Sequence, residues 1–431
     1  MEKVIKRNGD IVDYSGLKIE NAITNAYLEV YPNKTSFDAI ATAVAVKCMV
    51  EAKFLDTDSV KVEDIQDAVE DSLMLLDKEV SKAYIRYRHT HAMARDKYTE
   101  LVKELMNKIA GKNIVNQNAN VDEHSFGGRY GETADLLMKK LALEYYLSPK
   151  ARENHEGNMI YVHDLSHYIL GDHNCLSIPF DDLLKNSFDT RQTDVRGAQS
   201  VGTALQLIAV IFQLQSLNQF GGVSATHIDW TLVPYIRKSF WKHYLDGLYY
   251  AARWDKDSIN SEELAKENVY LNHEITDEDF YEIKAAREYA MDMTAKELHQ
   301  GVEGLYHNLN TLQSRSGNQL PFTSINYGTC TLPEGRMAIK EILDVSIEGI
   351  GTKKTTSVFP CGIFQSMEGV NRKPGDPNYD LFRLALKSTA TRLYPNYANV
   401  EWSGNAGFDR SNPETYFSTM GKCKCSSYKT F

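Results

Sequence analysis

The pattern of apolar and polar positions in the first hundred residues predicts a short hairpin followed by helices. Residues 4–7 and 10–14 flank Asn8-Gly9, a dipeptide that favours a two-residue β-turn because both positions tolerate positive φ. Beyond Ser15, apolar residues recur every three or four positions, the spacing of amphipathic helices. We expect helices from Ser15 to Val30, over 37–53 with Ile40, Val44, Cys48 and Met49 facing inward, and over 65–87 with Asp58 or Ser59 as the N-terminal cap.

Beyond residue 120, long helical patterns alternate with short apolar runs. The runs at 159–163, 323–327 and 357–359 have strand character. The segments 198–219 and 280–303 have the apolar spacing of helices. Alternation of this kind predicts an α/β fold for the larger, second region.

A polar connecting region separates the two patterns. Residues 98–110 continue as a polar helix, and an asparagine-rich stretch follows that is typical of turns. We therefore place a domain boundary near residue 100.

Composition and charge narrow the class of protein. The chain has 431 residues, of which 42% are hydrophobic and 25% charged, and this is typical of a folded protein. Its net charge of −10 argues against nucleic-acid binding over a broad surface, which needs a basic face, but leaves small anions as ligands. Six widely spaced cysteines, the lack of an apolar signal segment and the lack of any run long enough to span a membrane predict a reduced, cytoplasmic protein.

Two sets of residues are candidates for chemistry. Lys6 and Arg7 on the hairpin, with Lys18 at a helix start, could cradle an anion, although exposed cations are more often simply solvated. Cys175 follows a polar, turn-forming segment and could face a cleft or belong to the core. Cys330 and Cys361 are expected to be buried, and His163, His167 and His173 to be structural rather than metal ligands, so we expect no metal site.

The first hundred residues resemble the ATP-cone, a regulatory nucleotide-binding module of ribonucleotide reductases. The resemblance lies in residues 4–9, in Lys18-Ile19 opening a helix, and in the segments 62–66 and 84–88. It implies a small, mainly helical domain whose ligand is ATP or dATP. Val62 is apolar where some relatives carry a hydroxyl. The implied ligand contacts are Lys6, Arg7, Asn8, Lys18 and Lys97.

The rest of the chain resembles the anaerobic, glycyl-radical ribonucleoside-triphosphate reductases. The motifs include residues 173–176, 200–222, 307–322, 359–364 and 392–396. The resemblance implies a ten-stranded α/β barrel with a finger loop inside it, incomplete in this chain. It also implies reduction of ribonucleoside triphosphates to deoxyribonucleoside triphosphates, with formate as the usual reductant. A thiyl radical on the finger loop removes the ribose 3′-hydrogen, and a second cysteine donates hydrogen on the opposite sugar face.

Particular residues follow from this second resemblance. Cys175 matches the hydrogen-donating cysteine, and Arg191, Arg196 and Gln199 lie where relatives bind a dNTP effector at a dimer interface. The implied partners are nucleoside triphosphates, a radical S-adenosylmethionine activating enzyme and a second copy of the chain.

The resemblance stops after Gly421. Lys422 stands where the finger-loop cysteine is expected, and Cys423 comes one residue late, so Cys423 is a displaced candidate for the radical thiol. The family's zinc cysteines and glycyl-radical loop have no counterpart in the sequence. We expect an ATP-cone over 1–100, part of the reductase barrel over 101–421 and an aberrant tail over 422–431, produced by a frameshift or by read-through into an intervening sequence. Such a polypeptide is predicted to lack turnover by itself.

Two other functions are compatible with an ATP-cone. One is a non-catalytic protein that still binds ATP and dATP. The other is a nucleotide-sensing repressor, but such proteins place a zinc ribbon before the cone, and no cysteine precedes Cys48.

Overall fold

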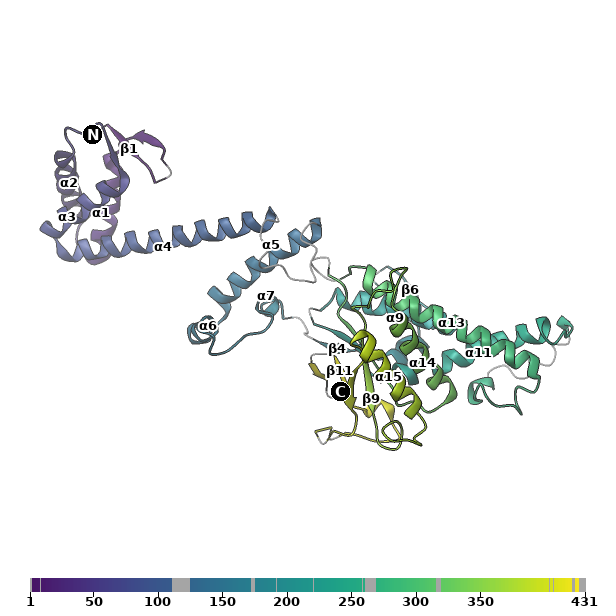
Figure 1. Ribbon diagram of the computed structural model, residues 1–431. Helices are drawn as coiled ribbons and strands as arrows, with labels where there is room; N and C mark the ends of the chain where they lie inside the picture. The colour runs from purple at the N-terminus through teal and green to yellow at the C-terminus, as the bar shows by residue number, and fades with distance from the viewer. Residues whose placement is uncertain are drawn as a thin grey trace. The chain divides into compact units, whose positions relative to one another are not determined.

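The computed structural model describes residues 2–7, 9–110, 125–171, 175–190, 192–219, 221–257, 259, 269–314, 319–402, 404–405, 407–420 and 423–425 (Figure 1). The side chains of residues 94–99, 420 and 423–425 lie outside this description. The chain forms two compact units, Met1–Asn107 and Lys108–Phe431, and each is described by itself.

A three-stranded sheet opens the N-terminal unit. Strands β1 (Lys3–Ile5) and β2 (Ile11–Asp13) are antiparallel, which confirms the predicted hairpin, and Gly9 has a φ of +89° in its turn. A third strand, β3 (Ser59–Lys61), pairs parallel to β1. Ser59 therefore lies in a strand, and the prediction that Asp58 or Ser59 caps the next helix is wrong, because that helix begins at Val62.

Four helices complete the unit: α1 (Gly16–Val30), α2 (Ser36–Lys53), α3 (Val62–Leu76) and α4 (Lys78–Ile109). The single helix predicted over 65–87 is wrong, since the chain breaks at Asp77. The Asp77 carboxylate accepts from the backbone N–H groups of Glu79 (3.0 Å) and Val80 (3.2 Å), so it caps the start of α4. The predicted polar helix over 98–110 is the last part of α4.

Helix α2 faces the core differently from the prediction. Ile40 is 51% exposed, and Val44, Cys48 and Met49 are also exposed. The buried positions are instead Ala39, Ala43, Val46 and Val50. Small side chains let neighbouring helices approach closely, so the alanine face of α2 packs inward while larger apolar groups remain outside.

The second unit is built on a five-stranded parallel sheet with the order β10-β9-β8-β7-β4. The strand β8 (Thr323–Tyr327) has the bounds that the sequence predicts. The other strands are β4 (Leu176–Ser177), β7 (Val223–Ala225), β9 (Cys361–Ser366) and β10 (Asn396–Asn399).

Two of the predicted strands do not form. Residues 159–163 bend after α6 (Pro149–Glu156), where the N–H groups of Met159 and Ile160 donate to the Asn154 carbonyl at 2.8 and 3.2 Å. Residues 357–359 only lead into β9, which starts after Pro360, a residue that has no N–H for a ladder.

Helices connect and cover the strands of this sheet. The two helices predicted for this unit over 198–219 and 280–303 are confirmed as α9 (Val201–Ser216) and α13 (Lys284–Thr311). The remaining elements of the unit are α5 (Phe126–Leu141), η2 (Ala142–Tyr146), α7 (Leu165–Tyr168), α8 (Phe180–Lys185), β5 (Phe188–Asp189), β6 (Asp194–Val195), α10 (Ile228–Thr231), α11 (Val233–Tyr250), η4 (Tyr270–Asn272), α14 (Pro333–Glu348), α15 (Tyr379–Arg392), η5 (Pro413–Thr415), β11 (Ser418–Met420) and β12 (Cys423–Cys425).

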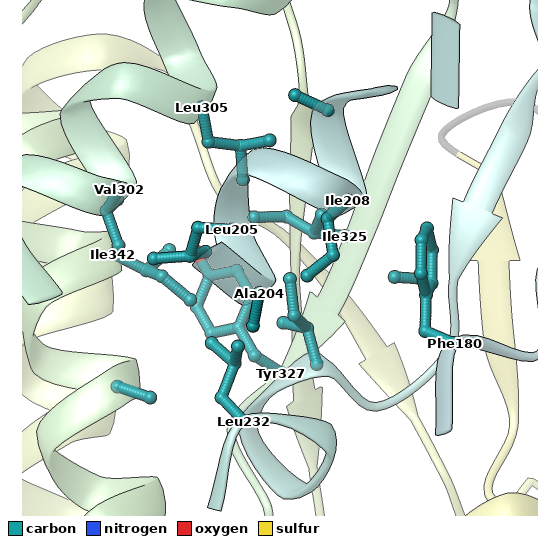
Figure 2. Packing of buried hydrophobic residues seen from close by; sticks show 14 of the residues in the cluster. Phe180, Ala204, Leu205, Ile208, Leu232, Val302, Leu305, Ile325, Tyr327 and Ile342 are labelled. Carbon is teal, nitrogen blue, oxygen red and sulfur yellow. The ribbon is translucent and has the colours of Figure 1, made fainter. Parts of the chain in front are cut away.

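The main core lies between one face of the sheet and its covering helices. Figure 2 shows Ile325 and Tyr327 of β8 packed among apolar side chains from several helices, including Leu205, Val302 and Ile342. All five are at most 1% exposed. This face is therefore a dry apolar layer, and the mixed α/β organisation predicted for the second region is confirmed. That this sheet is an incomplete part of a ten-stranded barrel stays a prediction.

No helix in the described part of the chain is long and apolar enough to cross a membrane.

Candidate functional site

The hairpin of the N-terminal unit presents the first candidate cations. The Lys6 N–H donates to the Asp10 carbonyl (2.8 Å) and the Gly9 N–H donates to the Lys6 carbonyl (3.0 Å), so the turn is closed by its own backbone. The Lys6 side chain is exposed and has no ion pair with any described residue. Asn8 lies outside the described residues.

Lys18 lies in the first turn of α1. That turn contains no acidic residue, and its cap, Ser15, makes no side-chain hydrogen bond to the helix. The Lys18 side chain is exposed and forms no ion pair with the described side chains. The positive end of a helix and a lysine are thus available here to an anion. The side chain of Lys97 lies outside the described part of α4.

Arg7 differs from these two lysines because its guanidinium is already engaged. Its Nε forms an ion pair with Glu63, and its Nη2 donates to the Gln66 side-chain oxygen at 2.9 Å. Glu63 is also held by Arg88 at 2.8 Å, and Arg88 reaches Asp67 (2.6 Å) and Glu70 (2.7 Å). The sequence pattern contains these residues but does not reveal that they form one network.

The second unit has a polar sheet face on the side opposite the apolar layer. In a parallel sheet, paired residues point the same way, and residues two apart share a face. Ser177 pairs with Ser224, and Ser224 pairs with Ser324, so these side chains lie on one side with Asn326 and Gln365. We call the set Ser177, Ser224, Ser324, Asn326 and Gln365 the polar face.

Strand β11 lies over the polar face and is held there by hydrogen bonds. The Asn326 amide donates to the Thr419 carbonyl and accepts from the Thr419 N–H, both at 3.1 Å. The Gln365 amide donates to the Phe417 carbonyl at 3.1 Å. Both side chains are fully buried, so they fix the backbone that leads into residues 421 and 422.

Two polar atoms of this face have no hydrogen-bond partner among the described residues. They are the Ser324 hydroxyl and the Gln365 side-chain oxygen, and both are buried. Unpaired buried polar groups cost free energy, so these atoms favour a polar ligand or water on this side of the sheet.

Cys175 lies immediately before β4 and is half-buried. The backbone continues the β4 pairing at this point, because the Leu176 N–H donates to the Gly222 carbonyl at 3.0 Å. Alternation along the strand gives Cys175 the same side as Ser177, which belongs to the polar face. The structure thus brings Cys175 and β11 to the same side of one sheet.

Strand β12, which follows β11 in the chain, is described by its backbone alone. β12 pairs antiparallel to β11, with Cys423 opposite Met420. Residues 421 and 422 and the side chain of Cys423 lie outside the described part, so the assignment of Cys423 as a displaced radical thiol stays a prediction.

Two of the three predicted effector residues, Arg196 and Gln199, lie between β6 and α9. Arg196 and Gln199 are exposed, and the Gln199 amide donates to the Gly197 carbonyl at 3.2 Å. Arg191 lies outside the described residues.

The start of α9, which follows them, already has its backbone donors satisfied. The N–H groups of Val201, Gly202 and Thr203 donate to Ser239 (2.9 Å), Glu297 (3.1 Å) and Ser200 (3.2 Å), respectively. An anion near Arg196 would therefore depend on side chains and not on this helix end.

A buried acid, Asp229, and an ion pair between His227 and Asp181 lie near the carboxyl ends of β7 and β8. The Asp229 carboxylate accepts from the N–H groups of Gly328, Thr329 and Cys330 at 2.9 to 3.0 Å, yet burial raises its pKa above the ordinary value. Burial lowers the pKa of His227, but the hydrogen bond to Asp181 at 2.6 Å and the charges of the nearby carboxylates together raise that pKa more, and the net shift is upward. These contacts hold the loops at this edge of the sheet, and the sequence pattern does not reveal them.

The other cysteines and histidines do not form a metal site in the described part of the chain. Cys330 and Cys361 are buried, as predicted. His163 is mostly exposed beside Asp164, and His167 lies 2.9 Å from the Ser166 hydroxyl, while His173 is outside the described residues. No group of three or more His, Cys, Asp or Glu side chains is placed to hold a metal ion among the described residues.

Comparison with known proteins first identifies the regulatory module. Residues 2–93 match the family described as the ATP cone domain. The N-terminal unit, with its hairpin and helices, is therefore an ATP cone.

The larger region then identifies the family of the chain. Residues 117–426 match the anaerobic ribonucleoside-triphosphate reductase family. This match covers more than half of the chain, and the chain belongs to that family of oxidoreductases.

Curated relatives extend beyond this chain. The anaerobic ribonucleoside-triphosphate reductase of Haemophilus influenzae is 29% identical over 402 residues, covering 92% of this chain and 52% of the relative. That of Escherichia coli is 28% identical, covering 92% and 51%, and that of Enterobacteria phage T4 is 29% identical, covering 67% and 43%. The chain spans about half the length of the curated relatives it matches.

Solved structures are similar only at a distant level. The anaerobic ribonucleotide reductase from Thermotoga maritima in complex with dATP and CTP is 13% identical, with a TM-score of 0.41 over 70% of this chain and 50% of that chain. The same enzyme with dATP bound in the specificity site gives a TM-score of 0.38 at 12% identity.

Proposed function

We propose that the ATP cone of this chain binds ATP and dATP through Lys6 and Lys18, with Arg7, Asn8 and Lys97 as further contacts. The observation that supports the proposal most directly is the start of α1, where an exposed lysine without an ion pair lies in a first turn that has no acid. Ammonium groups bind phosphates as compact point charges, and the helix end adds backbone donors.

Isothermal titration of the 431-residue chain with each nucleotide tests this proposal. We expect Lys18→Ala to weaken binding by about tenfold, since one charge-assisted contact contributes roughly 1.5 kcal/mol. Lys34→Ala is the matched control, because Lys34 is also exposed but follows the opposite end of α1. No measurable binding by the wild-type chain would refute the proposal.

For the second unit, we propose a role in reducing ribonucleoside triphosphates to deoxyribonucleoside triphosphates. Cys175 would donate hydrogen to the sugar as the 2′-hydroxyl leaves as water, with formate oxidised to carbon dioxide as the reductant. Cys175 shares its side of the sheet with the polar face, and Ser324 and Gln365 offer buried polar atoms to a ligand there. A buried, preorganised polar surface suits a radical reaction that must exclude water.

The family's metal and radical groups enter this proposal only as expectations. A structural zinc site needs four ligands, and the described residues contain no group of even three. No step is therefore assigned to zinc or to a glycyl radical in this chain.

Lys422 bears on turnover by the isolated chain. An ammonium group cannot form the thiyl radical that the resemblance requires at this position. We propose that the 431-residue chain does not reduce nucleotides by itself, and deoxynucleotide formation after treatment with a radical S-adenosylmethionine activating enzyme would overturn this.

The effector site and the assembly are part of the same proposal. Arg196 and Gln199, with Arg191, would bind a dNTP effector at the interface of a homodimer in the cytoplasm. Because the α9 donors are occupied, the side chains must carry the contact, so Arg196→Ala should abolish dNTP binding that persists when Lys18 is replaced.

A second candidate function is nucleotide binding without catalysis. The residue that favours it is Lys422. Tight dATP binding by a chain that shows no turnover with any partner would support this candidate over the reductase.

A further inference from the structure

Arg7 forms an ion pair with the Glu63 carboxylate, and the same side chain is one of the proposed contacts of a nucleotide phosphate. Its Nε pairs with Glu63 and its Nη2 donates to Gln66, although the Arg7 side chain remains 41% exposed. The remaining face of the side chain is open to solvent, so a ligand can reach Arg7 without unfolding the hairpin.

The sheet register explains why Glu63 is the partner. In the parallel pair of β1 and β3, Ile5 lies opposite Lys61. Just beyond this pair, β1 leads into the hairpin turn that carries Arg7 and β3 leads into α3, which carries Glu63, so the pairing brings these two segments side by side. Glu63 also lies in the first turn of α3, where the helix dipole favours a carboxylate.

Glu63 is a charged competitor and not a neutral neighbour. The hydrogen bond from Arg7 lowers the pKa of Glu63 below its ordinary value, which keeps the carboxylate ionised at neutral pH. Two arginines and three carboxylates form the network of Arg7, Arg88, Glu63, Asp67 and Glu70, so its net charge is −1. A triphosphate approaching Arg7 therefore meets a region whose positive charge is already neutralised.

We propose that Glu63 competes with the phosphates of a bound nucleotide for Arg7 and so sets the affinity of the cone. This inference rests on the proposed binding of ATP and dATP. When a nucleotide binds, Arg7 turns from the Glu63 carboxylate to a phosphate oxygen. Glu63 then keeps its bond to Arg88, which is held in place by Asp67 and Glu70.

The decisive variant is Glu63→Gln, assayed by titration of the full chain with ATP and with dATP in the presence of magnesium. We expect both nucleotides to bind about fivefold more tightly, because the ion pair that must be given up contributes up to about 1 kcal/mol. Asp67→Asn is the matched control. It removes one negative charge from the same network without touching Arg7, and we expect it to change affinity by less than about twofold.

A double-variant cycle separates this competition from a general effect of charge. In an Arg7→Met background, Glu63→Gln should lose most of its tightening effect, because the contested cation is gone. An equal gain in nucleotide affinity from Glu63→Gln and from Asp67→Asn would overturn the inference. The same gain from Glu63→Gln in the wild-type and in the Arg7→Met backgrounds would also overturn it. Weaker binding by Glu63→Gln would also overturn it, since Glu63 would then orient Arg7 for the phosphate.

The outcome also distinguishes this inference from the function it depends on. If the wild-type chain binds neither nucleotide, the proposed function fails. If it binds and Glu63→Gln leaves the affinity unchanged, the proposed function stands and the competition does not exist. Circular dichroism of each variant establishes that the N-terminal unit is folded.

Discussion

The two units use polar side chains in opposite ways. In the N-terminal unit, Arg7, Glu63 and Asp67 form ion pairs at the surface, with side chains 41% to 65% exposed. In the second unit, Asn326 and Gln365 are neutral and fully buried, and they are hydrogen-bonded to the backbone of Thr419 in β11 and of Phe417 just before it.

This difference separates contacts that a ligand can replace from contacts that hold a strand in one place. Exposed ion pairs contribute little to stability, because water and salt screen them, so a ligand can replace one partner at small cost. Buried amides are costly to leave unpaired, so they hold a strand in one place. Exposed ion pairs suit a site that exchanges its contacts when a ligand binds, and buried amides suit a strand that must keep one position.

The largest effect is expected where the buried arrangement is broken. Asn326→Leu leaves the Thr419 N–H and carbonyl and the Ala225 carbonyl without this partner. We expect the free energy of unfolding of the second unit to fall by about 3 kcal/mol in urea denaturation. Amide exchange at Thr419 should also speed up.

Asn218→Leu is the control for this variant. Asn218 is exposed, and its side-chain amide donates to the Leu214 carbonyl at 3.1 Å, its one side-chain hydrogen bond to the part of the chain that the structure describes, so a change within about 0.5 kcal/mol is expected. Equal losses for the two variants would remove the distinction between buried and exposed amides.

A second prediction concerns the packing of α2 against its neighbours, which stabilises the N-terminal unit. Ala43 is fully buried on α2, and Ala43→Leu would overpack the contact with neighbouring helices. We expect a loss of about 2 kcal/mol. Ile40→Ser, on the exposed side of the same helix, should cost less than about 0.5 kcal/mol in the same thermal or urea melt. A larger loss of stability for Ile40→Ser than for Ala43→Leu would instead support the sequence-based prediction that Ile40 faces inward.

A third prediction concerns Glu297, whose contribution to the free energy of unfolding is expected to be of intermediate size and to depend on pH. Burial raises its pKa, but hydrogen bonds from His243 (3.0 Å) and from the Gly202 N–H lower it more, to about 2. A carboxyl whose folded pKa is depressed stabilises the protein above its unfolded pKa of 4.5 and loses that contribution as the pH falls toward 2.

We expect Glu297→Gln to lower the free energy of unfolding by about 1 to 2 kcal/mol at pH 7 and to flatten its decline between pH 4.5 and 2. Glu288→Gln, an exposed position on the same helix, should leave the pH profile of the wild type intact. An unchanged profile for Glu297→Gln would contradict the role given to this carboxylate at the start of α9.

The smallest effect on stability is expected for Glu63→Gln. Its pair with Arg7 is exposed and its pair with Arg88 is only partly buried, so the free energy of unfolding should change by less than about 1 kcal/mol. A thermal melt without nucleotide measures this change. A loss as large as that of Asn326→Leu would mean that the surface network is structural, and the contrast between the two units would disappear.

Local patterns predicted the elements that depend on local interactions. The hairpin with its turn at Gly9, the helix α1 and the strand β8 follow from spacing and turn chemistry alone. The break at Asp77 was missed because the apolar spacing continues through it, whereas the cap depends on one carboxylate.

The networks could not be predicted because they depend on long-range register. Arg7 meets Glu63 because β3 pairs parallel to β1, whereas the sequence pattern predicts Asp58 or Ser59 as a helix cap and no strand there. The polar face arises from strands more than a hundred residues apart, such as those of Ser177 and Ser324. The resemblance to known families supplied Cys175 as a candidate, while its side of the sheet came from the structure.

The order of the parallel sheet also limits how it can grow. Within the described part of the chain, β4 and β10 each have one strand neighbour, so each has an outer edge. These strands are only two and four residues long, and a ladder on either edge would contain few hydrogen bonds. Any strand added there must be held mainly by side-chain packing, so the selection of a correct neighbour would depend on shape more than on backbone pairing.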